Sequence, residues 1–301
     1  MTETFTLAHF SDVHMSPIPG VAWQYWNAKR LFGFLNWQRS RRHVHSVAVA
    51  DRLIADALAL RSDHIAITGD LVNLGLPAEH EAALVWLTNI GPPDKVTVIP
   101  GNHDIYSSMR GDRGVARWAP YMGCEEDTLA FPFIRRVGPL ALVGLNSAVE
   151  TPPFVASGRL GPHQLEIAQE QFAELGEEGA IRVVLIHHPP LASLDTPRRG
   201  LKDAAHLRRL LERGDAELVL YGHNHKPTVT WLPTLGKPVP LVGVASASAA
   251  VAHGDEPLAQ YNLFTFFKNP DGLRIRHVVR GLSRPDGPVT KISESFLDAS
   301  S

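Results

Sequence analysis

The sequence predicts an α/β fold built in layers, and two observations carry that prediction. Short apolar runs typical of buried strands recur along the chain. Before Gly222 they alternate with amphipathic helical patterns, as in proteins whose helices cover a sheet. The predicted strands of this part are residues 5–10, 64–68, 95–99, 140–145, 181–186 and 217–221, and the predicted helices are residues 43–60, 78–89, 162–175 and 201–213.

Beyond Gly222 the pattern changes to strands without helices. The runs are residues 228–232, 239–245, 261–267 and 273–281, and an Asn-Pro-Asp-Gly turn at 269–272 joins the last two as a hairpin. We therefore expect a second, largely antiparallel sheet here. Residues 1–282 are predicted to form one domain. Residues 283–301, with their Pro, Gly and Ser content, are predicted to be a loosely ordered tail.

Composition limits the classes of function. The 301 residues carry 29 Lys and Arg against 31 Asp and Glu, a formal charge of −2, so no general basic field exists to hold nucleic acid. The lone Cys124 excludes an internal disulfide and a thiolate metal cluster, and it fits a reducing compartment. No export signal and no run of apolar residues long enough to cross a membrane is visible, so we expect a cytoplasmic protein.

Five polar clusters each follow a predicted strand directly. In an open α/β sheet the carboxyl ends of the strands form the edge where ligands bind, so all five can meet there. Singly, each cluster is also what a cap or a turn would look like. The occurrence of all five clusters at the ends of strands predicts a site. The clusters are Ser11-Asp12-Val13-His14, Gly69-Asp70, Gly101-Asn102-His103-Asp104, His187-His188 and Gly222-His223-Asn224-His225.

Together these loops offer carboxylates, an amide oxygen and several imidazoles, without a sulfur ligand. That set suits Mn, Fe, Zn or Mg, and it does not suit copper(I) or an iron-sulfur cluster. There are more ligands than one ion needs, so the sequence predicts a binuclear site. Two such ions can clamp both oxygens of an in-line displacement at phosphorus.

The ordered series Asp-x-His, Gly-Asp, Gly-Asn-His-Asp, His and Gly-His-x-His resembles the calcineurin-like metallophosphoesterases, in particular their bacterial phosphodiesterase branch, over residues 7–225. The resemblance implies a four-layer α/β/β/α sandwich of two mixed β-sheets flanked by helices. It also implies two divalent metal ions, Mn, Fe or Zn with Mn favoured. One ion would be held by Asp12, His14, Asp70 and His225, and the other by Asp70, Asn102, His187 and His223.

The same resemblance implies a mechanism. A metal-bound hydroxide would attack phosphorus in line, and His103 would act as general acid or as a cation beside the leaving group, with Asp104 orienting its ring. Hydrolysis of phosphodiesters is favoured over that of monoesters, because the four-part Gly-Asn-His-Asp and Gly-His-Asn-His motifs resemble those of the phosphodiesterase branch.

Residues 21–42, the aromatic-basic segment, contain three Trp, two Phe, one Tyr and five Lys or Arg, and no acid. Such a segment can lie in a membrane interface, which would suit a phospholipid or lipid-linked substrate and peripheral contact with the inner membrane face. The alternative interpretation is that the rings pack on the domain and the cations are solvated.

Three other functions remain open from the residues alone. One is a cyclic-nucleotide phosphodiesterase or another hydrolase of soluble nucleotides, and one is a catalytically silent binding module of the same fold. A nuclease would use the aromatic-basic segment to stack on unpaired bases. The near-neutral charge opposes a long footprint, and no stable nucleic-acid complex is expected. We find no Gly-x-Ser-x-Gly elbow, no Walker loop and no dinucleotide fingerprint.

Overall fold

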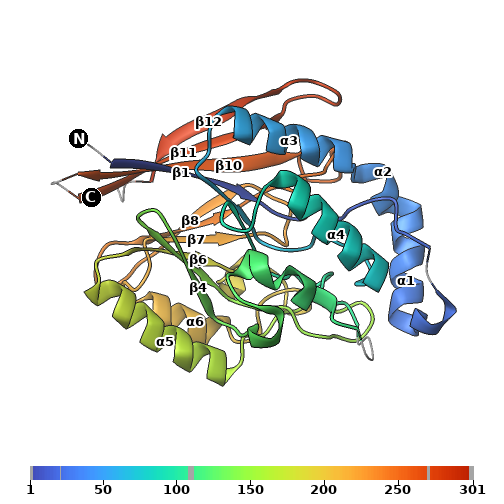
Figure 1. Ribbon diagram of the computed structural model, residues 1–301, viewed down its shortest axis with the longest axis horizontal. Coiled ribbons are helices and arrows are strands. Elements are labelled where there is room, and N and C mark those ends of the chain that lie inside the picture. The colour runs from blue at the N-terminus through green and yellow to red at the C-terminus, as the bar shows by residue number, and fades with distance from the viewer. Residues whose placement is uncertain (1–2, 21, 108–111, 270–271, 298–301) are drawn as a thin grey trace.

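The computed structural model describes residues 3–20, 22–107, 112–269 and 272–297. It shows two 6-stranded sheets packed face to face, with helices on both outer faces (Figure 1). The predicted four-layer α/β/β/α sandwich of two mixed sheets is confirmed. Its largest apolar cluster lies between the two sheets and under the helices of the first sheet, and a second cluster lies between the second sheet and its own helices.

The first sheet has the strand order β12-β11-β10-β1-β2-β3. Its three parallel strands are β1 (Glu3–Phe10), β2 (His64–Ile67) and β3 (Val96–Val98). Its antiparallel strands are β10 (Gln260–Asn269), β11 (Gly272–Leu282) and β12 (Val289–Phe296). Parallel pairing of β1, β2 and β3 places their carboxyl ends at one edge.

The second sheet has the order β4-β5-β6-β7-β9-β8. Its central strands are parallel: β5 (Leu140–Gly144), β6 (Ile181–Leu185), β7 (Leu218–Tyr221) and β9 (Val239–Gly243). The two edge strands, β4 (Phe133–Val137) and β8 (Thr228–Leu232), are antiparallel to their neighbours.

The strands beyond Gly222 do not form a sheet of their own, so that expectation was wrong. β8 and β9 extend the second sheet, whereas β10, β11 and β12 extend the first. The physical reason is the burial of β1, whose Leu7 and Phe10 are fully buried. A buried strand needs hydrogen-bonding partners on both sides, and β10 supplies the partner opposite β2.

The prediction that residues 283–301 form a loosely ordered tail is also partly wrong. Val289–Phe296 form β12, which pairs with β11 along the open edge of the first sheet. Almost all of this strand is exposed, so its sequence lacks the apolar alternation that identifies a half-buried strand. Residues 298–301 lie outside the described residues.

Helices α3 (Val47–Ala59) and α4 (Pro77–Ile90) cover the first sheet, and α5 (Pro162–Glu177) and α6 (Ala204–Leu211) cover the second (Figure 1). All four correspond to predicted helices. The 3₁₀ helices of the described chain are Trp23–Tyr25, Gly114–Met122, Glu126–Thr128 and Ala192–Leu194. No helix in the described part of the chain has the length and apolarity needed to cross a bilayer.

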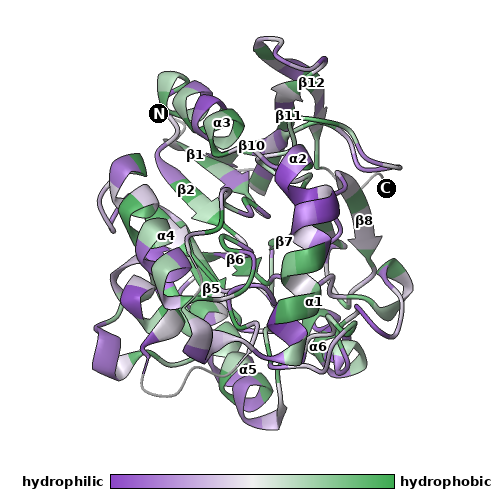
Figure 2. Cartoon of the chain, turned by 90° about the vertical axis from the view of Figure 1, so that its right-hand side faces the viewer, coloured by the Kyte–Doolittle hydropathy of each residue, from purple (hydrophilic) through white to green (hydrophobic). Residues whose placement is uncertain are grey.

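The aromatic-basic segment folds as a helical arm. After the Trp23–Tyr25 turn come α1 (Ala28–Asn36), a π-helical turn (Trp37–Arg41) and α2 (Arg42–Val44). Figure 2 looks onto the edge to which the parallel strands point and shows α1 and α2 lying across it. Val21 lies outside the described residues.

A partly buried ion pair connects α3 to the first sheet. The guanidinium of Arg280 on β11 donates from Nε and Nη2 to the two carboxylate oxygens of Asp56, at 2.7 and 2.9 Å. The hydroxyl of Tyr261 on β10 donates to the same carboxylate at 2.6 Å. Burial opposes ionisation, but the hydrogen bonds from Arg280 and Tyr261 prevail and lower the pKa of Asp56.

We predict that Asp56→Asn lowers the free energy of unfolding by about 1–3 kcal/mol at pH 7, because charge-assisted hydrogen bonds are lost. Folding lowers the pKa of Asp56, so its contribution is complete above the ordinary value of 3.8 and is lost as the pH falls through the folded value. Urea unfolding from pH 7 down to pH 3 should show the deficit shrinking in acid. The control is the exposed Asp127→Asn, and a deficit that stays constant with pH would contradict the assignment.

Candidate metal centre

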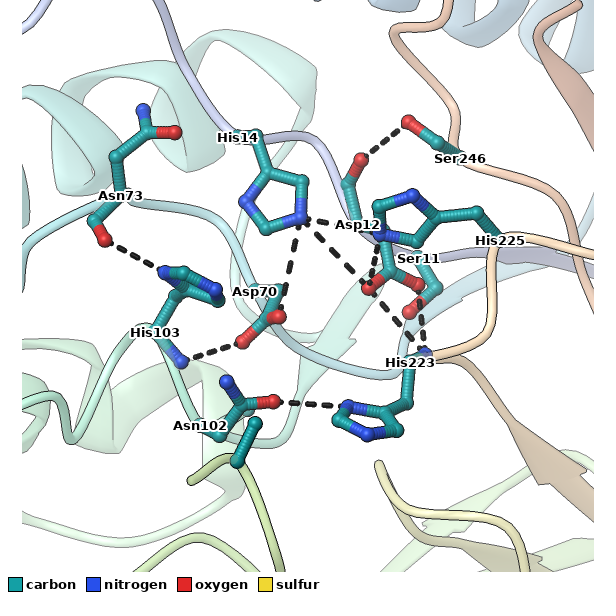
Figure 3. Close-up of polar contacts among 12 residues, drawn as sticks. Ser11, Asp12, His14, Asp70, Asn73, Asn102, His103, His223, His225 and Ser246 are labelled. Carbon is teal, nitrogen blue, oxygen red and sulfur yellow. Dashed lines mark hydrogen bonds and ion pairs between the residues drawn. The ribbon is translucent and has the colours of Figure 1, made fainter. Parts of the chain in front are cut away.

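All five predicted clusters meet at the edge where the parallel strands of both sheets end. Figure 3 labels residues from each cluster except His187-His188. The loops after β1, β2 and β3 bring their side chains from the first sheet, and the loops after β6 and β7 bring theirs from the second. Every residue predicted to bind metal lies in this cluster, and each is largely buried: Asp12, His14, Asp70, Asn102, His187, His223 and His225.

Two glycines of the motifs are needed because the loops nearly touch. A Cβ at Gly101 would lie 2.3 Å from Oδ1 of Asp70, and a Cβ at Gly222 would lie 1.9 Å from Oγ of Ser11 and 2.6 Å from Oδ2 of Asp12. Real Cβ atoms do not approach other atoms this closely. The glycines therefore allow loops from different strands, and at Gly222 from different sheets, to place their ligands side by side.

The site residues carry backbone strain. Five of them have left-handed backbone conformations, with φ between 43° and 69°: Asp12, His14, Asp70, His223 and His225. For a residue with a Cβ this conformation costs roughly 1–2 kcal/mol. Strain of this kind persists where the surrounding structure enforces it, and it is concentrated at functional sites. Here it turns the side chain at each strand end toward the common centre.

One group of ligand atoms surrounds Asp12. Nε2 of His225 lies 3.2 Å from Oδ1 of Asp12 and 3.2 Å from Nε2 of His14. Nε2 of His14 lies 3.9 Å from the same Asp12 oxygen and 3.8 Å from Oδ2 of Asp70. These four residues are the set predicted for the first ion.

A second group surrounds Asn102. Its Oδ1 lies 3.1 Å from Nε2 of His187 and 2.9 Å from Nδ1 of His223. Nε2 of His187 is also 3.3 Å from Oδ2 of Asp70. The same oxygen of Asp70 therefore faces both groups. This is the arrangement expected of a carboxylate that bridges two ions.

Backbone carbonyls fix the orientation of two of the imidazoles. Nδ1 of His187 lies 2.7 Å from the carbonyl oxygen of Thr68, a contact that joins the two sheets, and Nδ1 of His14 lies 3.3 Å from that of Val72. A carbonyl oxygen only accepts hydrogen bonds, so each Nδ1 carries the proton and donates, and Nε2 is directed at the centre. This is how ligand imidazoles are usually oriented.

Carboxylates lie beside the other two imidazoles, and neither acid was predicted from the sequence. Glu256 hydrogen-bonds to His225, whereas Asp195 lies close to His223 without a hydrogen bond. Nε2 of His223 lies 3.4 Å from Oδ2 of Asp195, and Nδ1 of His225 lies 2.9 Å from Oε2 of Glu256. Neither acid belongs to a motif or follows a predicted strand. Only the folded chain reveals them.

The electrostatics show that the centre attracts positive charge at two positions. Burial disfavours protonated imidazoles, yet the charge of Asp70 raises the pKa of His187 to about 9, and that of Asp12 raises the pKa of His225 to about 9. Burial alone would raise the pKa of Asp70, but its histidine neighbours hold it well below its usual range. The protons on His187 and His225 lie beside Asp70 and Asp12, where a divalent cation could neutralise the same carboxylates. The donor set therefore fits two ions.

His187, and not its neighbour, faces the centre, as the sequence predicts. The ring of His188 turns away, with Nδ1 2.7 Å from Oγ of Ser147 and Nε2 3.0 Å from the carbonyl oxygen of Ala156. His188 therefore belongs to the packing under the site.

The predicted role of Asp104 was wrong. Its carboxylate does not bond to the His103 ring. Nδ1 of that ring lies 2.6 Å from the carbonyl oxygen of Asn73 instead (Figure 3). Asp104 accepts from the backbone N–H groups of Asp70 and Gly101, both at 2.8 Å, and of Val72 at 3.1 Å. The turn after β3 folds its side chain back, so Asp104 joins two loops.

Further residues lie around the centre, in a cavity of ≈ 220 Å³. The ring of His45 lies 4.8 Å from that of His14, tilted by 59°, and His45 could serve as a ligand with His14 and His225. Two cations enter from elements that carry no motif, Arg41 from the π-helical turn and Arg199 from the loop before α6. Of these, only Arg41 had a sequence signal, as part of the aromatic-basic segment.

The comparisons with curated proteins agree with this geometry. A glycerophosphodiester phosphodiesterase of Enterobacter lignolyticus is 25% identical over 229 residues, which are 74% of this chain and 72% of the relative. A cAMP/cGMP dual specificity phosphodiesterase of Mycobacterium tuberculosis is 28% identical over 74% of this chain and 63% of its own length. A probable cyclic nucleotide phosphodiesterase of Synechococcus is 29% identical over 54% of this chain and 58% of its own length.

Solved structures show the same fold at low identity. A dimetal phosphatase from Danio rerio matches with a TM-score of 0.60 and 14% identity, over 97% of this chain and 99% of the other. A purple acid phosphatase from yellow lupin matches with a TM-score of 0.57 and 14% identity, over 98% of this chain and 54% of the other. The family model of calcineurin-like phosphoesterases matches residues 5–227, which include every motif of the centre. The chain belongs to the calcineurin-like phosphoesterase family.

Proposed function

We propose that this protein is a metal-dependent phosphodiesterase that hydrolyses small organic phosphodiesters. The observation that carries the proposal is Asp70, whose Oδ2 faces both ligand groups, 3.8 Å from His14 and 3.3 Å from His187. A carboxylate shared in this way fits a pair of ions better than one. Every predicted ligand position is filled, whereas a catalytically silent binding module would be expected to have lost some of these ligands.

The proposed ligands are Asp12, His14, Asp70 and His225 for one divalent ion and Asp70, Asn102, His187 and His223 for the other. Nitrogen and oxygen donors without sulfur fit Mn, Fe or Zn, and we favour Mn. Two such ions would supply Lewis acidity at the phosphoryl oxygens and activate water at neutral pH. The carboxylate of Glu256 would hold His225 in its orientation, and that of Asp195 would place a negative charge beside His223.

His103 is the residue proposed to assist departure of the leaving group. Its backbone N–H donates to Oδ1 of Asp70 at 2.7 Å, so the residue is tied to the bridging carboxylate. Its Nδ1 donates to Asn73, and its Nε2 faces the guanidinium of Arg41 at 2.8 Å. In this arrangement Nε2 accepts from Arg41 and carries no proton, and burial together with Arg41 lowers the pKa of His103 to about 3. To protonate the leaving oxygen, the ring would have to lose its contact with Arg41 when substrate binds and take up a proton at Nε2.

A diester is favoured over a monoester because the curated relatives described above are named for diester substrates, glycerophosphodiesters and cyclic nucleotides. A lipid diester is the second candidate. It is favoured by exposed apolar side chains on the helical arm and at Phe154, with 85% of Trp23, 48% of Leu31, 45% of Phe32 and 76% of Phe154 exposed. Phe32 and Phe154 line the cavity beside the site. Large apolar groups gathered on one surface often mark a contact with membranes or partners.

We predict that Asp70→Asn lowers turnover of bis(4-nitrophenyl) phosphate by more than about 100-fold. Loss of a residue that only orients a ligand typically costs ~10–100-fold, and Asp70 serves both ions directly. Metal content, measured by mass spectrometry after gel filtration with Mn, should fall from two per chain. The matched control is Asp255→Asn, an exposed acid near the site. Near wild-type turnover in Asp70→Asn would refute the binuclear assignment.

His103→Ala should slow diesters with alkyl leaving groups by roughly 100-fold or more, the usual range for a proton donor. Nitrophenyl esters should lose much less, since nitrophenolate leaves without a proton. The comparison uses kcat on two diesters that differ only in the leaving group. Equal losses on both would remove this role from His103.

The two candidate substrates can be separated by one comparison. Hydrolysis of bis(4-nitrophenyl) phosphate, a cyclic nucleotide and a phosphatidyl lipid in mixed micelles is measured with Mn and with chelator. If the lipid is the substrate, it should be turned over fastest, and Trp23→Ser should lower only that rate. If the soluble diesters are hydrolysed faster and Trp23→Ser leaves all rates unchanged, a lipid substrate is rejected.

A further inference from the structure

Arg41 reaches the metal centre from the helical arm. Its Nη1 lies 2.8 Å from Nε2 of His103, and its side chain lines the same cavity as Asp70 and Asn102. It is the last residue of the π-helical turn between α1 and α2. Such turns are rare and are frequent at functional sites, because the extra residue changes the direction of the side chains that follow.

The arm is firmly attached, so this position of Arg41 is fixed by the fold. The guanidinium of Arg30 is almost fully buried, at 1% exposed, and donates to the backbone carbonyls of Tyr25, Leu74, Gly75 and Ser107 at 2.9 to 3.3 Å. These bonds connect α1 to the segments after β2 and β3 that also carry Asp70 and Asn102.

The carboxylates of Asp70 and Asp12 favour the charge of Arg41 from a distance, without direct contact. No carboxylate of the described chain forms an ion pair with it, and its Nε and Nη2 make no hydrogen bond to described residues. Arg41 is partly buried, so a guanidinium with free donors at the wall of the cavity is placed to bind an anion there. Nε and Nη2 form the fork that binds phosphate in a bidentate way.

Beyond Arg41 the cleft opens into a larger cavity of ≈ 630 Å³ between α1 and residues 153–156. Its wall carries the cations Lys29, Arg39 and Arg199 and the rings of Phe32, Tyr106 and Phe154, and none of its lining residues in the described chain is acidic. The rings of Phe32 and Phe154 lie 5.0 Å apart. The volume lies within the usual range for small organic ligands, roughly 300–1,000 Å³.

We propose that Arg41 binds the non-bridging oxygens of the scissile phosphate, and that the adjacent cavity takes an apolar or aromatic ester group carrying a second anionic group. The inference rests on the proposed function and narrows its substrate class. The metals and Arg41 then hold the phosphate from two sides. The rings contact the ester group, and Arg39 with Lys29 faces its second charge.

The test of Arg41 uses metal-loaded protein and compares Arg41→Met and Arg41→Lys with Arg42→Met. Arg42 is the matched control, since it is the neighbouring, exposed arginine and its Nε bonds to His43 outside the cleft. Arg41→Met should weaken the binding of inorganic phosphate by calorimetry and lower kcat/KM for diesters, each about 10- to 100-fold, as expected for charged hydrogen bonds. Arg41→Lys should be intermediate, because the charge stays and the fork is lost.

Metal content and thermal unfolding of each variant show whether the centre and the fold are intact. If the wild type is active and Arg41→Met equals Arg42→Met in phosphate binding and in kcat/KM, the inference is overturned and the proposed function remains. If the wild type hydrolyses no diester, the proposed function fails, and phosphate binding then tests the role of Arg41 by itself. Weaker phosphate binding in Arg41→Met alone supports that role. Equal phosphate binding in Arg41→Met and Arg42→Met overturns it.

The second anion is tested with thymidine 5′-(4-nitrophenyl phosphate), with and without a 3′-phosphate. The leaving group is the same in both substrates, so a difference in their KM values reports on the cavity. The 3′-phosphate should lower KM about 10-fold in the wild type and in Arg42→Met, and Arg39→Met should remove most of that gain. An equal KM for both substrates in the wild type would overturn this part of the proposal.

Discussion

The structure depends on one constraint: loops from two different sheets must approach within van der Waals contact so that one carboxylate, Asp70, can face two groups of ligands. Hydrogen bonds across the interface hold that approach. The N–H of His223 donates to Oδ2 of Asp12 at 3.0 Å, and the hydroxyl of Ser246 donates to the carbonyl of Asp12 at 2.6 Å (Figure 3). The sheets are therefore joined at the centre itself as well as through the apolar core.

This constraint is costly, because the loops that carry the ligands hold left-handed residues. The facing imidazole nitrogens, 3.2 Å apart between His14 and His225 and 3.3 Å apart between His187 and His223, are hydrogen-bonded. The rest of the fold offsets these costs. Asp104 accepts three backbone N–H groups from the loops after β2 and β3. Buried Glu79 does the same for the backbone of Asn73, Leu74 and Leu76, which positions the carbonyl that orients His103.

The sequence was informative wherever structure is local. Buried strands, amphipathic helices and the polar clusters at strand ends could be predicted, because periodicity and strand-end position follow from neighbouring residues. Which strands pair is not local, and β10 beside β1 could not be inferred. The same holds for Asp195 and Glu256, whose contacts with His223 and His225 exist only after folding. Asp104 was misassigned because adjacency to His103 in the chain did not become contact in space.

The aromatic-basic segment shows most clearly why composition does not determine role. Its cations were assigned to one surface, but the fold divides them. Arg30 is buried and bonded to carbonyls, Arg41 enters the metal centre, and Arg42 remains outside. Its rings are divided too, since Trp37 donates to Ser16 at 3.0 Å while Trp23 is exposed. An arm that contributes both a cation to the centre and a wall to the adjacent cavity is suited to select the substrate. The motif residues would then perform the chemistry.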